Sequence, residues 1–374
     1  MTPRELALAG AVAWCCAGCA PVGLLPYRAD QPPTVSLPLA LAGVRDERAA
    51  FAELFERESG TAERSEDADR TRWLHLAPAA STAPRPDLAR LRASFAARAP
   101  ATVVLVVPGL FGDCVGAQSV PFGDGVLRPP PADVAAPYRQ YADLGLRAIQ
   151  LLEVPGRASS AANGRLLADA IRAESALPDR RRLVLVGYSK GVADLLVALA
   201  ILQREGGVPA SVVAVVSVAG AVMGSPLADR YEAAFDALSP RVTPFDCTAS
   251  QGGEMGSLTR RERIAWLAAN PPPAGIDYYS IVAHAPLDEL ALPLRATARQ
   301  LAAFDPHNDG QLLAFDAILP RSTLLAEVRA DHWDVALPRD RHPNPLVRAL
   351  TSGRRYPREA LFRAIVQWVV GTSR

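Results

Sequence analysis

The sequence predicts an α/β protein with a doubly wound, mostly parallel sheet, and three observations lead to this fold class. The chain has 374 residues, 49% of them hydrophobic and 21% charged, which is enough apolar material for a full core. Short β-branched runs recur without polar alternation, as expected of strands that are buried on both faces. Helical patterns lie between several of these runs, and such alternation over about 270 residues favours crossover connections in a parallel sheet.

The composition excludes several functional classes. The chain carries 40 basic and 39 acidic residues, so its net charge of +1 gives no reason to expect nucleic acid as a partner. The high apolar content excludes a disordered chain and a disulfide scaffold. No uninterrupted apolar stretch reaches about 18 residues, which excludes a protein with several membrane spans.

The N-terminus predicts a signal peptide over residues 1–18. Arg4 gives a weakly positive start, and the apolar stretch from Leu6 to Trp14 is too short to span a bilayer but suits a secretory segment. The small residues before Cys19 resemble the lipobox of bacterial lipoproteins, although Cys16 stands where that motif usually has Leu. We therefore expect an exported, periplasmic or cell-envelope lipoprotein, attached to a membrane surface through an acylated Cys19. An ordinary cleaved signal peptide is the alternative.

Two cysteines remain in the body of the chain, Cys114 and Cys247. In an oxidising compartment they can form one disulfide bond, but two free thiols agree equally well with their spacing. No group of Cys and His has the spacing of a zinc site, so we expect no metal.

Residues 19–100 are expected to form a Pro-rich tether followed by an N-terminal helical region. Prolines are frequent from 21 to 40, and the charge-dense stretch from 45 to 70 contains apolar residues at helical spacing. A second helical pattern runs from Asp87 to Ala99.

Residues 101–374 are expected to form the catalytic domain. The expected strands are Thr102–Val107, Arg147–Val154, Leu183–Val186, Val212–Val218, Tyr278–Val282 and Leu324–Val328. The expected helices are Asn163–Arg172, Val192–Arg204, Ala228–Leu238, Arg295–Phe304 and Arg358–Val370. The last of these carries Leu361, Ile365 and Val369 on one stripe, which we expect to pack against the sheet. An insertion at about 225–275 is too long for a simple crossover.

The motif at 187–191, GYSKG, follows a buried strand and precedes a helix. A Gly-x-Ser-x-Gly motif in this context predicts a sharp turn that lifts Ser189 clear of the sheet as a nucleophile. The glycines are needed because side chains at these positions would collide with neighbouring backbone. A Ser–Lys dyad with Lys190 is disfavoured, because adjacent residues in such a turn project in different directions.

Acyl transfer needs two backbone N–H groups directed at the oxyanion that develops on the substrate. One is expected from Lys190, which directly follows the nucleophile. The other is expected from Leu110, in the loop at 108–113 that follows the strand Thr102–Val107.

The serine also needs a histidine base, and in this type of site the order along the chain is Ser, acid, His. His332 follows the last strand on a loop and is the expected base, with His342 as the alternative. The other three of the five histidines are disfavoured by their position in the chain: His75, His284 and His307.

The acid that orients this histidine is expected to be Asp309, which lies on an Asn-Asp-Gly turn before His332. Asp305 is the alternative. Asp331 and Asp334 lie too close to His332 in the sequence to orient its ring from behind.

These motifs together resemble those of the α/β-hydrolase superfamily, and within it the bacterial secreted lipases. The matching segments, which occur in that family's order, are PGLFGD (108–113), GYSKG (187–191), GSPLAD (224–229), NDGQL (308–312) and DHWD (331–334). One departure is Pro108, where those lipases usually have a histidine. The resemblance implies that the insertion at about 225–275 is a lid over the acyl pocket, although a fixed cap is equally compatible with the sequence. It gives no basis for a calcium site here.

We therefore expect a serine hydrolase that cleaves carboxylic esters with an apolar acyl group through an acyl-enzyme, without a cofactor. Acyl transfer to an alcohol, polyester depolymerisation and thioester hydrolysis would use the same residues. A non-catalytic binding module of the cell envelope is the alternative from another class. The complete set of Ser189, Asp309 and His332 counts against that module, and no feature predicts an oligomeric state.

Overall fold

A computed structural model describes Leu39 and residues 43–60, 72–75, 87–114, 116–124, 136–179, 181–238, 248–341, 345, 348 and 355–374. The expected signal peptide, Cys19, Cys247 and His342 lie outside these residues. Across the described ranges, no helix combines the length and the hydropathy that crossing a membrane requires.

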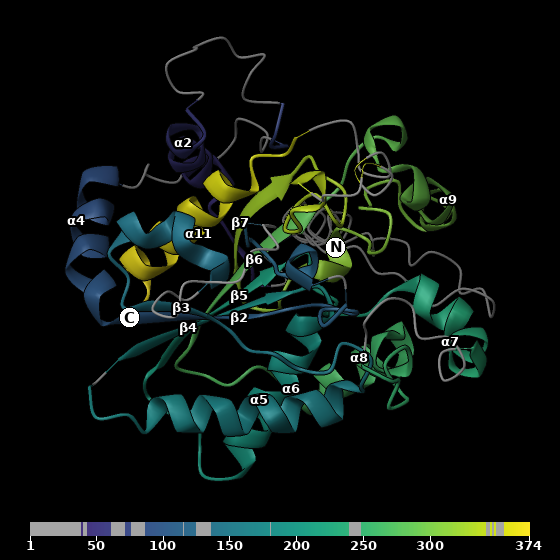
Figure 1. Cartoon of the computed structure of the whole chain (residues 1–374), viewed down its shortest axis with the longest axis horizontal. Coiled ribbons are helices and arrows are strands. Elements are labelled where there is room, and N and C mark those ends of the chain that lie inside the picture. Colours follow the sequence, from purple (N-terminus) through teal and green to yellow (C-terminus); the bar gives the residue numbers. More distant parts are fainter. Residues whose placement is uncertain are drawn as a thin grey trace, which may run out of the picture.

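The centre of the molecule is a seven-stranded parallel sheet in the order β1-β7-β6-β5-β4-β2-β3 (Figure 1). The strands are β1 (Arg45–Asp46), β2 (Thr102–Val107), β3 (Ala148–Leu151), β4 (Arg182–Tyr188), β5 (Val212–Val218), β6 (Asp277–Ala283) and β7 (Thr323–Val328). All six predicted strands are present, and the predicted fold class is confirmed. The two-residue strand β1 is an addition, which pairs with β7 at the sheet edge.

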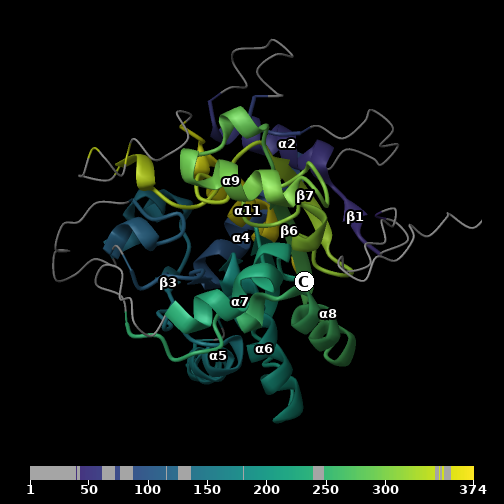
Figure 2. The same cartoon turned by 90° about the vertical axis from the view of Figure 1, so that its right-hand side faces the viewer.

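Helices cover both faces of this sheet. They are α2 (Arg48–Glu58), α4 (Leu88–Arg98), α5 (Ser160–Ser175), α6 (Lys190–Arg204), α7 (Pro226–Leu238), α8 (Arg260–Ala269), α9 (Leu292–Leu301) and α11 (Arg358–Thr372). The helices α2, α4 and α11 lie on one face, and α5, α6 and α8 lie on the other (Figure 1). The helices α7 and α9 lie beyond the carboxyl ends of the strands, which face the viewer in Figure 2.

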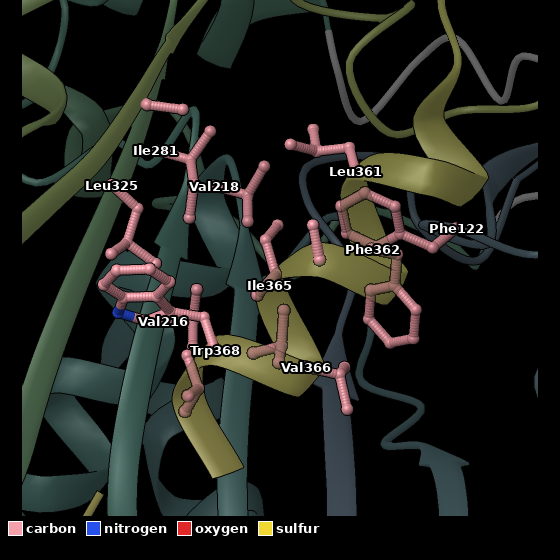
Figure 3. Close-up of a cluster of buried hydrophobic side chains, with 14 of the residues drawn as sticks. Phe122, Val216, Val218, Ile281, Leu325, Leu361, Phe362, Ile365, Val366 and Trp368 are labelled. Carbon is pink, nitrogen blue, oxygen red and sulfur yellow. The ribbon is translucent and has the colours of Figure 1, made fainter. Parts of the chain in front are cut away.

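The C-terminal helix α11 is the centre of the larger core. Leu361, Ile365 and Val369 are fully buried, as the sequence stripe predicts. Figure 3 shows Leu361 and Ile365 near Val218 of β5 and Ile281 of β6. Burying such side chains contributes about 1.5–3 kcal/mol each.

The N-terminal helices pack over the outer side of α11, so the residues before 101 share the core of the sheet. Phe51 of α2 meets Trp368 of α11 edge to face at 6.0 Å. Arg98 at the end of α4 donates to the carbonyl oxygens of Gly371 and Ser373 and so satisfies the last turn of α11. Because a second layer covers it, α11 is buried on more than the single stripe that faces the sheet.

The opposite face is closed by α5 and α6, which approach each other closely at Gly164. A Cβ atom at this position would lie 2.4 Å from Val197 Cγ1, so only glycine allows this contact. The second half of the 225–275 insertion also belongs to this face, because Trp266 and Leu267 of α8 pack against the same apolar cluster. The helix α8 thus serves as the crossover between β5 and β6.

Candidate active site

Ser189 lies in a strained turn between β4 and α6. Its φ of +54° is in the region that L-residues rarely occupy, as expected when a turn must point a side chain away from the sheet. The neighbouring glycines make the turn possible. A Cβ atom at Gly187 would lie 2.9 Å from Val192 Cα, and one at Gly191 would lie 2.5 Å from the carbonyl oxygen of Pro108.

Three side chains from three different loops form one line of hydrogen bonds. Ser189 Oγ lies 2.8 Å from His332 Nε2, and His332 Nδ1 lies 2.6 Å from Asp309 Oδ2. All three side chains are buried. The structure thus brings together the three residues that the sequence singled out, from positions up to 143 residues apart.

The backbone of His332 is fixed on both sides. The N–H of His332 donates to the carbonyl oxygen of Asp309 at 2.9 Å. The hydroxyl of Tyr188 donates to the carbonyl oxygen of His332 at 2.6 Å. Burial holds the pKa of the Tyr188 phenol well above its usual value, so the hydroxyl keeps its proton and remains a donor. Tyr188 occupies the variable position of the motif before Ser189, where the pattern alone gives no sign of this role.

The carboxylate of Asp309 is held by its own turn. Its Oδ1 accepts the backbone N–H groups of Gln311 at 2.8 Å and Leu312 at 2.7 Å, which leaves Oδ2 for His332. Gly310 takes a φ of +91° in this turn. The alternative acid, Asp305, instead bonds the ring of His307 at 2.8 Å.

Asp331 organises the loop that carries His332. Its carboxylate accepts backbone N–H groups from Ala291, Trp333 and Asp334 at 2.8–2.9 Å. Burial, together with the nearby charge of Asp309, raises the pKa of Asp331. Burial and the proximity of Asp331 likewise raise the pKa of Asp334 to about 9. Neither carboxyl bonds the imidazole of His332 in the described structure, in agreement with the sequence argument.

The backbone N–H groups of Leu110 and Lys190 are available for an oxyanion. Leu110 borders the same cavity as Ser189, and Lys190 is the first residue of α6. Neither N–H donates a hydrogen bond within the part of the chain that the structure describes. Unpaired N–H groups beside a nucleophile are the arrangement that stabilises a tetrahedral intermediate.

The loop of Leu110 is held in place by Asp113. One carboxylate oxygen accepts the N–H of Gly156 at 3.0 Å, and the other accepts the N–H of Thr248 at 3.0 Å. Thr248 also donates its hydroxyl to the same carboxylate. The next residue, Cys114, is disulfide-bonded, and its partner lies outside the described residues.

The side chain of Lys190 points away from Ser189 and towards Asp194. Its ammonium contacts both carboxylate oxygens of Asp194, at 2.7 and 2.8 Å, and both side chains are 1% exposed. Asn163 of α5 donates to the same carboxylate at 2.8 Å. This geometry agrees with the sequence argument against a Ser–Lys dyad.

The histidines that chain order disfavoured form a separate cluster. The rings of His75 and His284 stack at 3.7 Å, and the ring of His307 meets His284 edge on at 5.0 Å. None of the three lines the cavity that contains Ser189. In the described ranges, no group of three or more His, Cys, Asp or Glu residues has an arrangement that could hold a metal ion.

A cavity of about 320 Å³ opens beside Ser189 and His332. Such a volume lies at the small end of the usual range for ligand sites. Its walls are largely apolar and include Leu110, Phe111 and Leu337. Trp333 and Arg339 also line it, and sequence reasoning missed both, because no motif marks them.

The helix α7 reaches the rim of this cavity. The ring of Phe235 on α7 lies 6.2 Å from the ring of Phe111, a residue of the cavity wall. Together with the bond from Thr248 to Asp113, this contact places the first part of the 225–275 insertion beside the site.

No protein-family model and no curated protein matches the chain significantly. Among solved structures, the metagenomic carboxyl esterase MGS0156 is similar at a TM-score of 0.73 and 32% identity, over 91% of this chain and 96% of that one. The mature lipase BlEst2 of Bacillus licheniformis is similar at a TM-score of 0.46 and 21% identity, over 63% and 86%. Lipase 1 of Pelosinus fermentans is similar at a TM-score of 0.49 and 12% identity, over 72% of this chain and 98% of that one. The similarity to these two lipases is too low to support an inference. From the similarity to the metagenomic esterase, which extends over nearly the whole length of both chains, the chain belongs to the α/β-hydrolase superfamily.

Proposed function

We propose that the protein hydrolyses carboxylic esters through Ser189, His332 and Asp309. The observation that carries this proposal is the continuous line of hydrogen bonds from Ser189 Oγ through His332 to Asp309, which ends at a largely apolar cavity. The similarity to a carboxyl esterase supports the same class of reaction.

In the acylation step, Ser189 Oγ attacks the carbonyl carbon of the ester while His332 Nε2 takes the hydroxyl proton. Asp309 accepts a hydrogen bond from the Nδ1–H group of His332, which keeps the proton on Nδ1 and leaves Nε2 free to act as the base. The carbonyl oxygen becomes an oxyanion and receives hydrogen bonds from the N–H groups of Leu110 and Lys190. When the intermediate collapses, His332 returns the proton to the departing alkoxide, and the acyl group stays on Ser189.

In the deacylation step, water replaces the alcohol. His332 takes a proton from the water as it attacks the acyl carbon, and the second tetrahedral intermediate uses the same two N–H groups. Collapse of this intermediate returns the proton to Ser189 Oγ and releases the carboxylic acid. Every proton in both steps passes through His332 Nε2, so no metal or organic cofactor is required.

The decisive test replaces the nucleophile. Ser189→Ala should lower kcat for p-nitrophenyl butyrate about 10⁴-fold or more, because the attacking atom is lost. The matched control is Ser211→Ala, since Ser211 lies at the amino end of β5, opposite the carboxyl ends of the strands, and bonds only Ser175 among the described side chains. A fluorophosphonate probe should label the wild-type protein and leave Ser189→Ala unlabelled. Hydrolysis that survives in Ser189→Ala would contradict the proposal, and a wild-type protein that is inert in both assays would favour the binding module.

The first part of the 225–275 insertion is proposed to cap the cavity. Contacts on both sides of residues 239–247 support this role, since Phe235 meets Phe111 and Thr248 bonds Asp113. Phe235→Ala should shift the p-nitrophenyl ester of highest kcat/KM to a longer acyl chain, because removing the ring opens the rim. An unchanged chain-length profile would contradict the cap.

Export and attachment to a membrane surface through Cys19 remain part of the proposal. The sequence before Cys19 supports them, and so does the disulfide bond of Cys114, because such bonds persist in oxidising compartments. Mass spectrometry of the mature N-terminus should find a diacylglyceryl group on Cys19. An unmodified N-terminus at a later residue would favour an ordinary secreted protein instead.

A further inference from the structure

The wall of the catalytic cavity contains a single cation among the described residues, Arg339. It follows His332 by seven positions on the same loop, and its side chain is half-buried. A guanidinium in the wall of a cavity that accepts only an apolar acyl chain would be unfavourable. Taking its charge out of water costs several kcal/mol unless a partner of opposite charge offsets this free energy.

Arg339 has no such partner among the described residues. No hydrogen bond or ion pair joins its guanidinium to a carboxylate, whereas Arg341, two positions further on, contacts Glu359 at 2.6 Å. The adjacent carboxylate of Asp340 contacts a different cation, Arg358, at 2.7 Å. The contact that the structure gives Arg339 is a cation–π contact, with its guanidinium carbon 4.0 Å from the ring centre of Trp333.

The buried carboxyls closest to Arg339 are also poorly suited to neutralise it. Asp331 uses its carboxylate oxygens on the backbone N–H groups of Ala291, Trp333 and Asp334. Burial and the proximity of Asp331 raise the pKa of Asp334, which favours the neutral form of this carboxyl. Burial lowers the pKa of Arg339, and this effect outweighs the opposing charges of Asp331 and Asp334.

Among the described residues, no hydrogen bond uses the N–H groups of this guanidinium. A guanidinium presents a planar fork of donors, and this fork matches the two oxygens of a carboxylate. In the part of the chain that the structure describes, the cavity wall thus combines Ser189, an apolar surface and a cation without an anionic partner.

We propose that Arg339 binds a carboxylate of the substrate, so that the preferred esters carry a free carboxylate in their acyl or alcohol part. This inference rests on the proposed hydrolysis at Ser189. It adds a charged recognition element to the apolar acyl group that the sequence led us to expect.

The test compares pairs of esters that differ only in the carboxylate. For the acyl side, the pair is mono-p-nitrophenyl glutarate and p-nitrophenyl pentanoate. For the alcohol side, it is 4-acetoxybutanoate and 4-acetoxybutanamide, followed by titration of the acid that is released. The wild-type enzyme should give at least about tenfold higher kcat/KM for the charged member of one pair, since a hydrogen-bonded charge is worth about 1.5–3 kcal/mol. The pair that shows this preference identifies the side that carries the carboxylate.

Arg339→Gln should lower the ratio of kcat/KM for the charged ester to that for the neutral ester about 10- to 100-fold, mainly through a higher KM for the charged ester. Arg339→Lys should retain part of the preference, because the charge remains while the planar fork is lost. The matched control is Arg341→Gln, which removes a neighbouring arginine that already has a partner and should leave the ratio of the two esters unchanged.

Three results would overturn the inference: a wild-type ratio below threefold in both pairs, a preference for the neutral esters, or an equal loss on both esters in Arg339→Gln. The wild-type ratio decides the question even if the Arg339 variants do not fold. In all three cases Ser189-dependent hydrolysis of the neutral esters would still stand. If no ester is hydrolysed in a Ser189-dependent way, the proposed function itself fails.

Discussion

Ser189 and Lys190 are neighbours in the chain, but their side chains belong to two very different polar networks. The hydroxyl of Ser189 joins His332 and Asp309 and borders a cavity. The ammonium of Lys190 contacts Asp194, which also accepts a hydrogen bond from Asn163, and both charged side chains are buried. Both networks are hydrogen-bonded and buried, so burial and satisfied bonding do not by themselves distinguish a reactive site from a structural one.

The difference lies in what each network leaves available. At Ser189, the site keeps a cavity and two N–H groups that bond no other group in the described ranges. At Lys190, the ammonium contacts both carboxylate oxygens of Asp194, and both side chains are 1% exposed. The strained turn, with a φ of +54° at Ser189, directs the two successive side chains into different surroundings. The comparison predicts that damage to the first network costs rate, whereas damage to the second costs stability.

After the loss of Ser189 itself, the largest effect is expected from Asp309→Asn. The amide would still accept the N–H groups of Gln311 and Leu312, but its NH₂ group would face His332 Nδ1 and favour the wrong tautomer. We expect kcat for p-nitrophenyl butyrate to fall about 10³- to 10⁴-fold with little change in the free energy of unfolding. Asp305→Asn is the matched control and should retain nearly full activity, since Asp305 bonds His307 instead. Equal losses in the two variants would place the acid elsewhere.

Asp194→Asn tests the second network. It leaves the ammonium of Lys190 buried without its counter-charge, which should lower the free energy of unfolding by about 3–5 kcal/mol in urea titrations. The folded fraction should keep kcat within about tenfold of the wild type. The matched control is Asp169→Asn, which breaks an exposed pair with Arg172 and should cost about 0–1 kcal/mol. A loss of rate without a loss of stability would move Lys190 into the reaction.

Leu110→Pro tests one of the two oxyanion donors. Proline removes the backbone N–H while no other hydrogen bond of that N–H in the described structure is lost. We expect kcat to fall about 10²- to 10³-fold, as for the loss of one oxyanion donor elsewhere. Leu110→Ala keeps the N–H, so it serves as the control and should stay within about tenfold. If proline and alanine cost the same, the side chain rather than the N–H is what matters.

The most gradual effect, spread over a range of pH, concerns another buried acid, Asp316, which pairs with Arg260 at 2.9 Å. Burial raises its pKa to about 7, against the opposing effect of Arg260 and with a small contribution from Asp229. The folded protein therefore holds a proton on Asp316 that the unfolded chain loses near pH 4, so the free energy of unfolding should fall as the pH rises from about 4 to 7.

The expected slope of this stability loss approaches about 1.4 kcal/mol per pH unit. Asp316→Asn should remove this slope from urea titrations made across that pH range, at the cost of a lower stability throughout. Parallel pH curves for the wild type and the variant would show that Asp316 is ionised in the folded protein as well.

The central strands were predictable because they are buried on both faces and appear as apolar runs, as in Thr102–Val107, whereas β3 at the sheet edge is only half-buried. Strand β1 was not, because a strand of two residues carries no pattern. The helices α2 and α4 were predictable from their spacing, but their packing over α11 was not. Both faces of α11 are apolar, and only the assembled fold decides which neighbour covers each face.

The sequence by itself determined the residues that we propose to react. A nucleophile on a strand–turn–helix motif is expected to be followed by an acid and a histidine in a fixed order, and this rule selects Ser189, Asp309 and His332 without coordinates. The tertiary structure decided what surrounds them. It brings the hydroxyl of Tyr188 to the carbonyl oxygen of His332, encloses the pair of Lys190 and Asp194 between helices, and places Arg339 in the cavity wall without an anionic partner among the described residues. Reaction chemistry depends on local motifs, whereas recognition depends on which surfaces the fold places around the reacting atoms.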